Sequence, residues 1–380
     1  MDFDFTDDQE MLRDSVRKWV DKGYGFERRK VIVKSGGFSR EAWGEIADLG
    51  LAGLYVPEAH GGMGFGPVDA MVVMEELGRG LVLEPYAQAA LIAGDVLSSY
   101  APAPTQSAWL PKIASGEALV VLAQQERAAR YRLNHVTTAA KQTASGWTLT
   151  GAKSIVPVGD KADAFIVPAR VSGAVDDASG IALFLVTRST TGVTTRGYPT
   201  QDGGRAAELG FSNAQATLIA EPGHGFAALE HAVDIGIAAL CAEGVGVMDK
   251  LVALTVEYMN TRKQFGVPIA TFQALRHRIA DVKMQLELGR SMSYYASLKL
   301  NDPPELRRRA LAQAKLQLGT SMRFVGQQCI QLHGGIGMTD EYIGSHYFKR
   351  LTTMELTFGD SLHHLGEVSA RMQDTAGVFA

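Results

Sequence analysis

The chain has little of what marks several common protein classes. Its 380 residues include two cysteines, Cys241 and Cys329, and its formal net charge is −4 at pH 7. The two cysteines have no CxxC spacing and each lies within an apolar helical pattern, so they predict buried free thiols in a reducing compartment. A slightly negative chain offers no concentrated basic surface for phosphate groups, which argues against nucleic acid as the main partner.

Long hydrophobic runs and a targeting segment are also missing. No run reaches the ~20 apolar residues that span a bilayer, and the opening "MDFDFTDDQEML" has neither the basic nor the apolar region of a signal peptide. We therefore expect a cytoplasmic protein without a membrane span. No metal site is expected either, because the adjacent His363 and His364 would point in different directions on a helix and no third ligand has suitable spacing.

The composition that is present is that of a globular protein. Hydrophobic residues make up 46% of the chain and charged residues 21%, and the length predicts two or three domains. The first part has three helix-start signals. Thr6 and Gln9 form a capping-box pattern before an amphipathic stretch, Ser39 begins a second helix, and Pro67 begins a third as a first-turn proline.

Around Leu119 the pattern changes to short β-branched or alternating runs, separated by turn residues at intervals of about ten residues. From Gly225 onward a helical period returns in four long segments with short connections. The sequence thus predicts an N-terminal helical domain at residues 1–117, a middle antiparallel β-sandwich or barrel at 118–224, and a C-terminal four-helix bundle at 225–380.

This order of domains, with "TRKQFGVPIATFQ" from Thr261 and "QLHGGIGM" from Gln331, resembles the acyl-CoA dehydrogenase family of flavoproteins. The stretches "FTDDQEMLRDSVRKWV", "LYVPEAHGGMGFG" and "LTGAKSIVP" are similar to the family as well, so the resemblance covers nearly the whole chain. Within the family, the helix "LCAEGVGVMDKLVALTVEY" looks most similar to bacterial small subunits of pimeloyl-CoA dehydrogenase. The resemblance implies the acyl-CoA dehydrogenase fold, FAD as cofactor and an acyl-CoA thioester as substrate.

The resemblance also implies which residues contact the adenosine half of FAD. An arginine offers a planar, permanently charged donor fork to the pyrophosphate, an aromatic ring and a glutamine serve the adenosine, and two glycines allow close backbone approach. The residues assigned to the cofactor are Arg262, Phe265, Gln273, Gln331, Gly334, Gly335 and Asp360. These residues form two strips, one from Arg262 to Gln273 and one from Gln331 to Gly335. In the family the two strips come from different chains, with FAD across a dimer interface.

The residue that removes the α-proton of the thioester is missing from its usual place. The resemblance puts this carboxylate at position 358, where the chain has Phe358, followed by Gly359. A phenyl ring cannot accept a proton, but the backbone N–H of Phe358 can still donate to the thioester oxygen. Some relatives carry the base on the first bundle helix, at a position that corresponds to Gly236, and the arginine that is frequent beside it corresponds to Ile237. Neither residue is acidic.

Three carboxylates lie near these positions in the sequence. Asp234 and Glu355 are interpreted as ordinary solvated or ion-paired acids. Glu243 lies in "IAALCAEGVGVM", on an apolar helix face where an unpaired carboxylate would be costly. Glu243 is therefore either satisfied by a buried partner or a relocated catalytic base with a raised pKa.

The β-domain also departs from the family. Its flavin-cradling segment corresponds to "QERAARYR", which puts Gln125, Arg127 and Tyr131 where the family has Thr, Pro and Ser. The family's Trp-Ile-Thr corresponds to the segment from Ile155 to Pro157. Neither of these two side chains can back the isoalloxazine ring or offer a hydroxyl to its N5 atom.

The leading hypothesis is the small subunit of a heteromeric acyl-CoA dehydrogenase whose larger subunit carries the base. One alternative is a self-sufficient homotetramer, a dimer of dimers, with Glu243 as the base. Others are a flavin-free structural or acyl-CoA-binding subunit, and a flavin monooxygenase or desulfinase on the same fold. By family analogy an electron-transfer flavoprotein is the electron acceptor and fatty acid metabolism the setting.

Overall fold

The computed structural model describes residues 5–144 and 146–372. Its contacts divide the chain into two compact units, each assembled from separate segments. The helical unit contains Met1–Val31, Pro67–Val82 and Ile237–Ala380; the sheet unit contains Ile32–Gly66 and Leu83–Gly236. The three domains expected from the sequence are consecutive ranges of residues, whereas these two units are each built from separate segments. The expected domain boundaries near residues 117 and 225 stay a prediction. The outermost residues of those ranges lie outside the described part.

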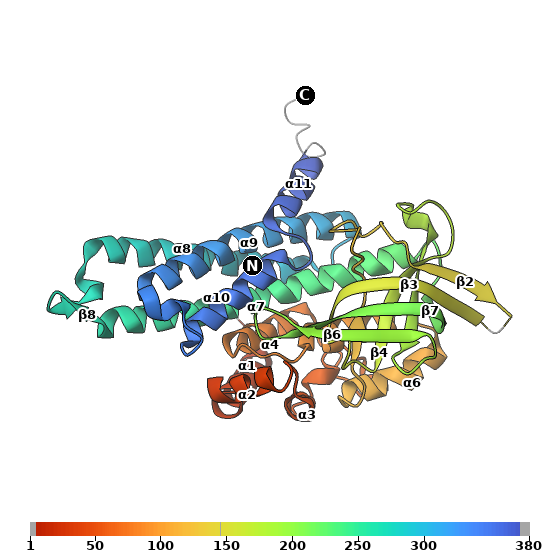
Figure 1. Cartoon of the computed structure of the whole chain (residues 1–380), viewed down its shortest axis with the longest axis horizontal. Coiled ribbons are helices and arrows are strands. Elements are labelled where there is room, and N and C mark those ends of the chain that lie inside the picture. Colours follow the sequence, from red (N-terminus) through yellow and green to blue (C-terminus); the bar gives the residue numbers. More distant parts are fainter. Residues whose placement is uncertain (1–4, 145, 373–380) are drawn as a thin grey trace. The chain divides into compact units, whose positions relative to one another are not determined.

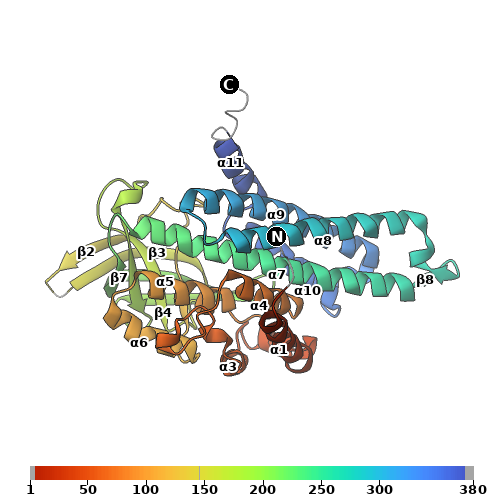
Figure 2. The same ribbon diagram turned by 180° about the vertical axis from the view of Figure 1, so that it is seen from behind.

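Long helices form most of the helical unit, and α8 and α9 run side by side in both views (Figures 1 and 2). The helices are α1 Asp7–Gly23, α2 Phe26–Lys34, α4 Pro67–Arg79, α7 Gly225–Thr261, α8 Gln273–Lys299, α9 Pro304–His333, α10 Ile343–Leu356 and α11 Ser361–Met372, of which α2 and α7 extend into the sheet unit. The last segment predicted for the bundle is thus two helices, because a loop between Leu356 and Ser361 interrupts the helix.

The helix starts expected from the sequence are confirmed. Thr6 and Gln9 form a reciprocal capping box at the start of α1. Ser39 accepts a hydrogen bond from the Ala42 N–H and caps α3, Arg40–Asp48, and α4 begins at Pro67. These signals were readable because each is local and needs no distant partner.

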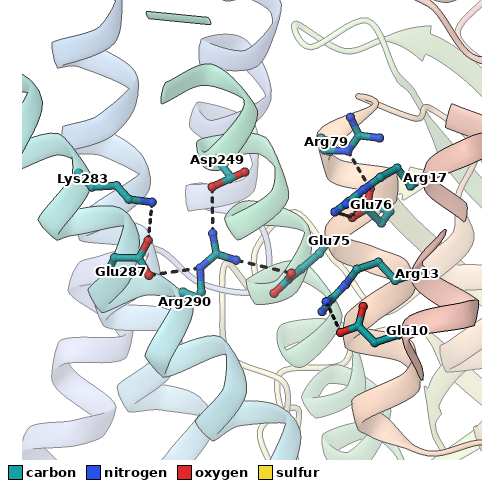
Figure 3. A network of polar contacts seen from close by, with 10 residues as sticks. All are labelled: Glu10, Arg13, Arg17, Glu75, Glu76, Arg79, Asp249, Lys283, Glu287 and Arg290. Carbon is teal, nitrogen blue, oxygen red and sulfur yellow. Dashed lines mark hydrogen bonds and ion pairs between the residues drawn. The ribbon is translucent and has the colours of Figure 1, made fainter. Parts of the chain in front are cut away.

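Two glycines let α4 and α7 approach at backbone distance. A Cβ atom on Gly78 would overlap the carbonyl oxygen of Glu243, and one on Gly246 would overlap that of Glu75. The close approach places the polar side chains of both helices among charged groups from α1 and α8. Figure 3 shows this network, in which Arg290 of α8 faces three carboxylates, those of Glu75, Asp249 and Glu287.

The sheet unit is built on a seven-stranded sheet that closes into a ring of strands, since β4 pairs with β2 at one side and with β5 at the other. The strands are β1 Val120–Leu122, β2 Ala139–Thr143, β3 Gly146–Pro157, β4 Ala164–Arg170, β5 Ile181–Thr187, β6 Val193–Pro199 and β7 Arg205–Ala220. The barrel expected from the sequence is confirmed, although β2 was not predicted. All pairings were expected to be antiparallel. This is wrong for β4, which runs parallel to β1 and β2.

The remaining helices of the sheet unit are α5 Ala93–Tyr100 and α6 Ala103–Ala114, and α5 packs against β1 and β7. Strands β4 and β5 are buried along nearly their whole length. Burial on both faces explains why they read as unbroken apolar runs and not as alternating ones. No helix in the described part of the chain is long and apolar enough to cross a membrane.

Candidate functional site

The first candidate cofactor strip is the connection between α7 and α8. Arg262 follows the last residue of α7, a small hairpin (β8 Lys263–Gln264, β9 Val267–Pro268) comes next, and Gln273 begins α8. The side chains of Arg262 and Gln273 are exposed and have no partner within the described residues. Phe265 is 92% exposed at the turn of the hairpin, where its φ is +54°. A bulky residue in this conformation is uncommon and presents its ring to solvent.

The second strip lies at the end of α9, where Gln331, Gly334 and Gly335 are exposed. Gly334 has a φ of +65°, which favours glycine, and no atom lies within 4 Å of a Cβ built on either glycine. Both strips occupy the same end of the bundle, because the core of this region joins Leu332 to residues from the first strip, Met259 and Ile269.

These residues fit the adenosine end of FAD. They combine an exposed guanidinium without a counter-ion in the described part of the chain, an exposed aromatic ring, an uncommitted amide and backbone that is open to close approach. Asp360, assigned to the cofactor with them, accepts a hydrogen bond from the His363 N–H at 2.8 Å and so caps α11. Its carboxylate already has a structural role in this chain.

The side chains expected to contact the isoalloxazine ring of FAD differ from those of the family. The amide of Gln125 donates to the Arg130 carbonyl oxygen at 2.6 Å, so it braces its own loop. Ile155 has a φ of +53° and is 59% exposed, beside a register shift between β3 and β7. Bulges redirect side chains in this way, but an isoleucine offers neither an indole nor a hydroxyl, and neither does Pro157.

Position 358 lies in the loop between α10 and α11. Phe358 has a φ of +58° and Gly359 of +109°, and the Phe358 N–H has no acceptor within the part of the chain that the structure describes. The carbonyl oxygens around it are bound: Lys315 donates to those of Glu355 and Gly359, each at 2.9 Å, and the His364 ring lies 3.0 Å from that of Phe358.

Burial controls the protonation of this loop's neighbours. It lowers the pKa of Lys315 to about 8 and, with the nearby Lys315 ammonium, lowers the pKa of His364 to about 3. At neutral pH His364 is therefore uncharged, and its ring can donate from Nε2 to the Phe358 carbonyl oxygen. The loop supplies a fixed backbone donor but no proton acceptor at residue 358.

Glu243 has a specific partner, which is half-buried. Arg350 of α10 donates to its carboxylate from Nε at 2.7 Å and from Nη2 at 2.8 Å. The pair is bidentate, which is the strongest arrangement for an arginine and a carboxylate. This geometry favours the structural reading of Glu243, and its role as a base stays a prediction.

The two other acids differ from each other. Glu355 is an ion-paired acid, as expected, since Arg323 lies 3.1 Å from its carboxylate. The carboxylate also accepts a hydrogen bond from the Ser361 N–H at 3.0 Å. Asp234 is fully buried and has partners, so of its two expected states, solvated or ion-paired, the solvated one is excluded. Gly236 and Ile237 follow within α7 and add no carboxylate.

His333 and the two cysteines are buried. His333 is buried between the Cys329 carbonyl oxygen at 2.8 Å and the Tyr342 hydroxyl at 2.9 Å. Both cysteines are buried and free, as expected, and burial raises the pKa of the Cys241 thiol to about 12. Within residues 5–144 and 146–372, no group of three or more His, Cys, Asp or Glu could hold a metal ion.

Two buried lysines, Lys315 in α9 and Lys153 in β3, were not predicted from the sequence. Lys153 is fully buried and donates to Glu126 at 2.8 Å. The available signal was a lone lysine inside an apolar run, as in "AQAKLQL". A charge in such a place needs a specific partner, which the sequence does not identify.

Models of three domains match this chain in order: "Acyl-CoA dehydrogenase, N-terminal domain" at residues 6–117, the middle domain at 122–214 and the C-terminal domain at 223–373. Among curated proteins, acyl-CoA dehydrogenase FadE27 of Mycobacterium tuberculosis is 26% identical over 99% of this chain and 100% of its own. Probable acyl-CoA dehydrogenase YngJ of Bacillus subtilis is 28% identical over 95% and 97%.

Solved structures agree in fold. A chain of the ChsE4–ChsE5 complex from Mycobacterium tuberculosis is 26% identical and has a TM-score of 0.88, with 98% of this chain and 99% of that chain covered.

Proposed function

The chain belongs to the acyl-CoA dehydrogenase family of oxidoreductases, and from this premise we propose that it is the small subunit of a heteromeric, FAD-dependent acyl-CoA dehydrogenase. In this proposal the chain contributes the adenosine-side contacts of FAD. A larger subunit carries the catalytic carboxylate. The observation that carries the proposal is this contrast between a complete adenosine-side set and a phenyl group at residue 358.

FAD is the cofactor that the family implies, and when bound it accepts the hydride from the β-carbon of the thioester. Arg262 would bind its pyrophosphate, with Gln273 and the glycines 334 and 335 beside the adenosine. The free N–H of Phe358 would donate to the thioester carbonyl oxygen, a contact that strengthens as negative charge develops there. Removal of the α-proton needs a base that residue 358 does not provide.

A heteromer supplies that base without any change in this chain. The ChsE4–ChsE5 complex, whose chain shares this fold at 26% identity, shows that a relative assembles from two named components. The alternative of a homotetramer with Glu243 as its base is less well supported, because Arg350 occupies both oxygens of that carboxylate. A dicarboxylyl or branched acyl group would suit the resemblance to pimeloyl-CoA dehydrogenase small subunits.

Flavin content tests the proposal. The chain co-expressed with a dehydrogenase subunit encoded beside it should yield a complex with about half an FAD per chain, since in this proposal only the larger subunit holds the flavin ring, for which this chain lacks the family's residues. Arg262→Gln should lower that content several-fold, whereas Arg278→Gln, which removes an equally exposed charge from α8, should not. One full FAD per chain in the isolated protein would contradict the proposal, and a colourless complex would favour a flavin-free subunit.

Three further points are part of the proposal and follow from family analogy alone. They are an electron-transfer flavoprotein as acceptor, a dimer-of-dimers assembly and a cytoplasmic role in fatty acid metabolism. An electron-acceptor assay on the complex separates a dehydrogenase from a monooxygenase or desulfinase, because only the dehydrogenase passes electrons from its substrate to an external acceptor.

A further inference from the structure

The loop of residues 357–360 is held by a lysine that contacts it from another helix. Lys315 lies in the middle of α9 and is fully buried, yet its Nζ reaches the carbonyl oxygens of Glu355 and Gly359 at 2.9 Å each. One of these carbonyls precedes Phe358 and the other follows it. Because water does not reach this ammonium group, the two hydrogen bonds are costly to lose.

A second contact closes the same loop from the outside. The carboxylate of Glu355 accepts hydrogen bonds from the Ser361 N–H at 3.0 Å and from the Ser361 hydroxyl at 2.8 Å. The last turn of α10 is thereby joined to the first residue of α11. His364 adds the contact to the Phe358 carbonyl oxygen at 3.0 Å.

These contacts hold the backbone on both sides of Phe358. Each peptide unit is planar, with its C=O and N–H groups on opposite sides, so the bound carbonyl of Phe358 orients the Gly359 N–H and the bound carbonyl of Gly359 orients the Asp360 N–H. The Phe358 N–H shares its peptide plane with the Thr357 carbonyl and lies between the two carbonyls that Lys315 binds, and it has no acceptor among the described residues. The positive φ of Phe358 persists only because neighbours hold it.

We propose that Lys315 is a positioning residue for the substrate: by binding the carbonyl oxygens of Glu355 and Gly359, it fixes the Phe358 N–H in the direction from which it donates to a thioester carbonyl oxygen. The inference rests on the proposed function, because it assigns Lys315 a role in recognition of an acyl-CoA thioester. Lys315 acts through the loop and does not contact the substrate itself.

The test compares two ligands that differ at one group. A CoA thioester has the carbonyl oxygen, whereas an S-alkyl-CoA thioether with the same carbon chain lacks it. Affinities of both are measured by calorimetry on the FAD-loaded full chain, with its partner subunit present, after wild-type titrations from butyryl- to palmitoyl-CoA select the chain length. Lys315→Met keeps the buried volume and removes the donor. It should lower affinity for the thioester about tenfold, the value of a lost hydrogen bond, and leave the thioether unchanged.

Lys153→Met is the matched control, because it also removes a buried ammonium but lies in the sheet unit. It should lower the melting temperature without changing the ratio of thioester to thioether affinity. Ser361→Ala loosens the same loop while Lys315 stays, and should reduce thioester affinity selectively by about threefold. This second variant decides the matter if Lys315→Met does not fold.

The outcomes separate the two levels of the argument. If the wild-type protein binds no CoA thioester of the series, the proposed function itself fails. If it binds thioester and thioether equally, or if Lys315→Met and Ser361→Ala weaken both ligands alike or neither, the proposed role of Lys315 is wrong while the function stands. Selective loss of the thioester supports both.

Discussion

Arg350 binds both carboxylate oxygens of Glu243, at 2.7 and 2.8 Å, across 107 positions of sequence. The carboxylate lies on α7 and is nearly buried, while the guanidinium comes from α10 and is partly exposed. Glu243, the candidate for a relocated base, therefore already accepts strong hydrogen bonds at both of its carboxylate oxygens.

Glu243→Gln should affect stability more than catalysis. The amide leaves the Arg350 guanidinium without its counter-charge, so we expect the free energy of unfolding to fall by about 1–3 kcal/mol, measured by urea denaturation. Turnover of the complex should change by less than about threefold, far below the hundredfold or more that loss of a general base costs. Arg350→Met alone should also destabilise, and the double variant by less than the sum. A hundredfold loss of turnover in Glu243→Gln would restore the relocated-base hypothesis.

Phe358→Glu should give this chain a base. The loop already holds residue 358 at a φ of +58° with an anchored backbone, so the carboxylate replaces the phenyl ring without a new backbone conformation. We expect exchange of the α-protons of bound acyl-CoA with deuterated solvent to rise about a hundredfold, measured by NMR. Phe358→Gln has the same shape without the acid and should show no rise. Equal rates in the two variants would mean that the loop does not present residue 358 to the substrate.

The buried pair of Glu126 and Lys153 predicts a component of acid unfolding. Burial alone would raise the pKa of Glu126, but the Lys153 ammonium and the hydrogen bonds from Thr137 lower it from 4.5 to about 2. A carboxyl group with a lower pKa in the folded state stabilises it above pH 4.5 and loses that effect as the pH falls toward 2. The free energy of unfolding should fall by up to ~3 kcal/mol across this window from this group alone.

Urea denaturation between about pH 5 and about pH 2, the window in which this carboxyl group titrates, checks this component. Glu126→Gln should unfold more easily at neutral pH, because Lys153 is left buried without its counter-charge. Its stability should then depend less steeply on pH than that of the wild type. Parallel pH profiles for the two proteins would show that Glu126 does not carry the effect.

For Glu75 we expect the opposite pH dependence of the free energy of unfolding. Burial between α4 and its neighbours raises its pKa to about 7. Its Oε1 has no hydrogen-bond partner among residues 5–144 and 146–372, and Arg290 is 3.7 Å from Oε2 (Figure 3). A carboxyl group with a higher pKa in the folded state binds more protons there, so stability falls as the pH rises from 4.5 to 7. Glu75→Gln removes this ionisation.

At about pH 8 the Glu75→Gln variant should be more stable than the wild type by about 2 kcal/mol, and at about pH 4 the two should be nearly equal. Arg290 keeps Asp249 at 3.0 Å and Glu287 at 3.3 Å, so the substitution does not leave it unpaired. Glu287→Gln is the matched control: it removes a surface partner of the same arginine and should change stability little at either pH. A less stable Glu75→Gln variant at about pH 8 would show that the Arg290 contact outweighs the burial.

The helix starts at Thr6, Ser39 and Pro67 and the buried runs of β4 and β5 could be predicted from the sequence. Each depends on side chains a few positions apart, and the free energy that favours them is local. The lack of a carboxylate at residue 358 is likewise a fact of the sequence, and no folding can supply one. The sequence by itself therefore determined the order of helical and β segments and what the chemistry of residue 358 excludes.

Only the tertiary structure decided which distant groups meet. Arg350 was not visible as the partner of Glu243, nor Lys315 as the residue that binds the loop around Phe358, because contacts between distant segments depend on how helices pack and not on sequence spacing. The parallel pairing of β4 with β1 and β2 has the same origin. Buried charges need partners wherever the fold brings them, so a sequence shows the need, and the packed structure shows which residue meets it.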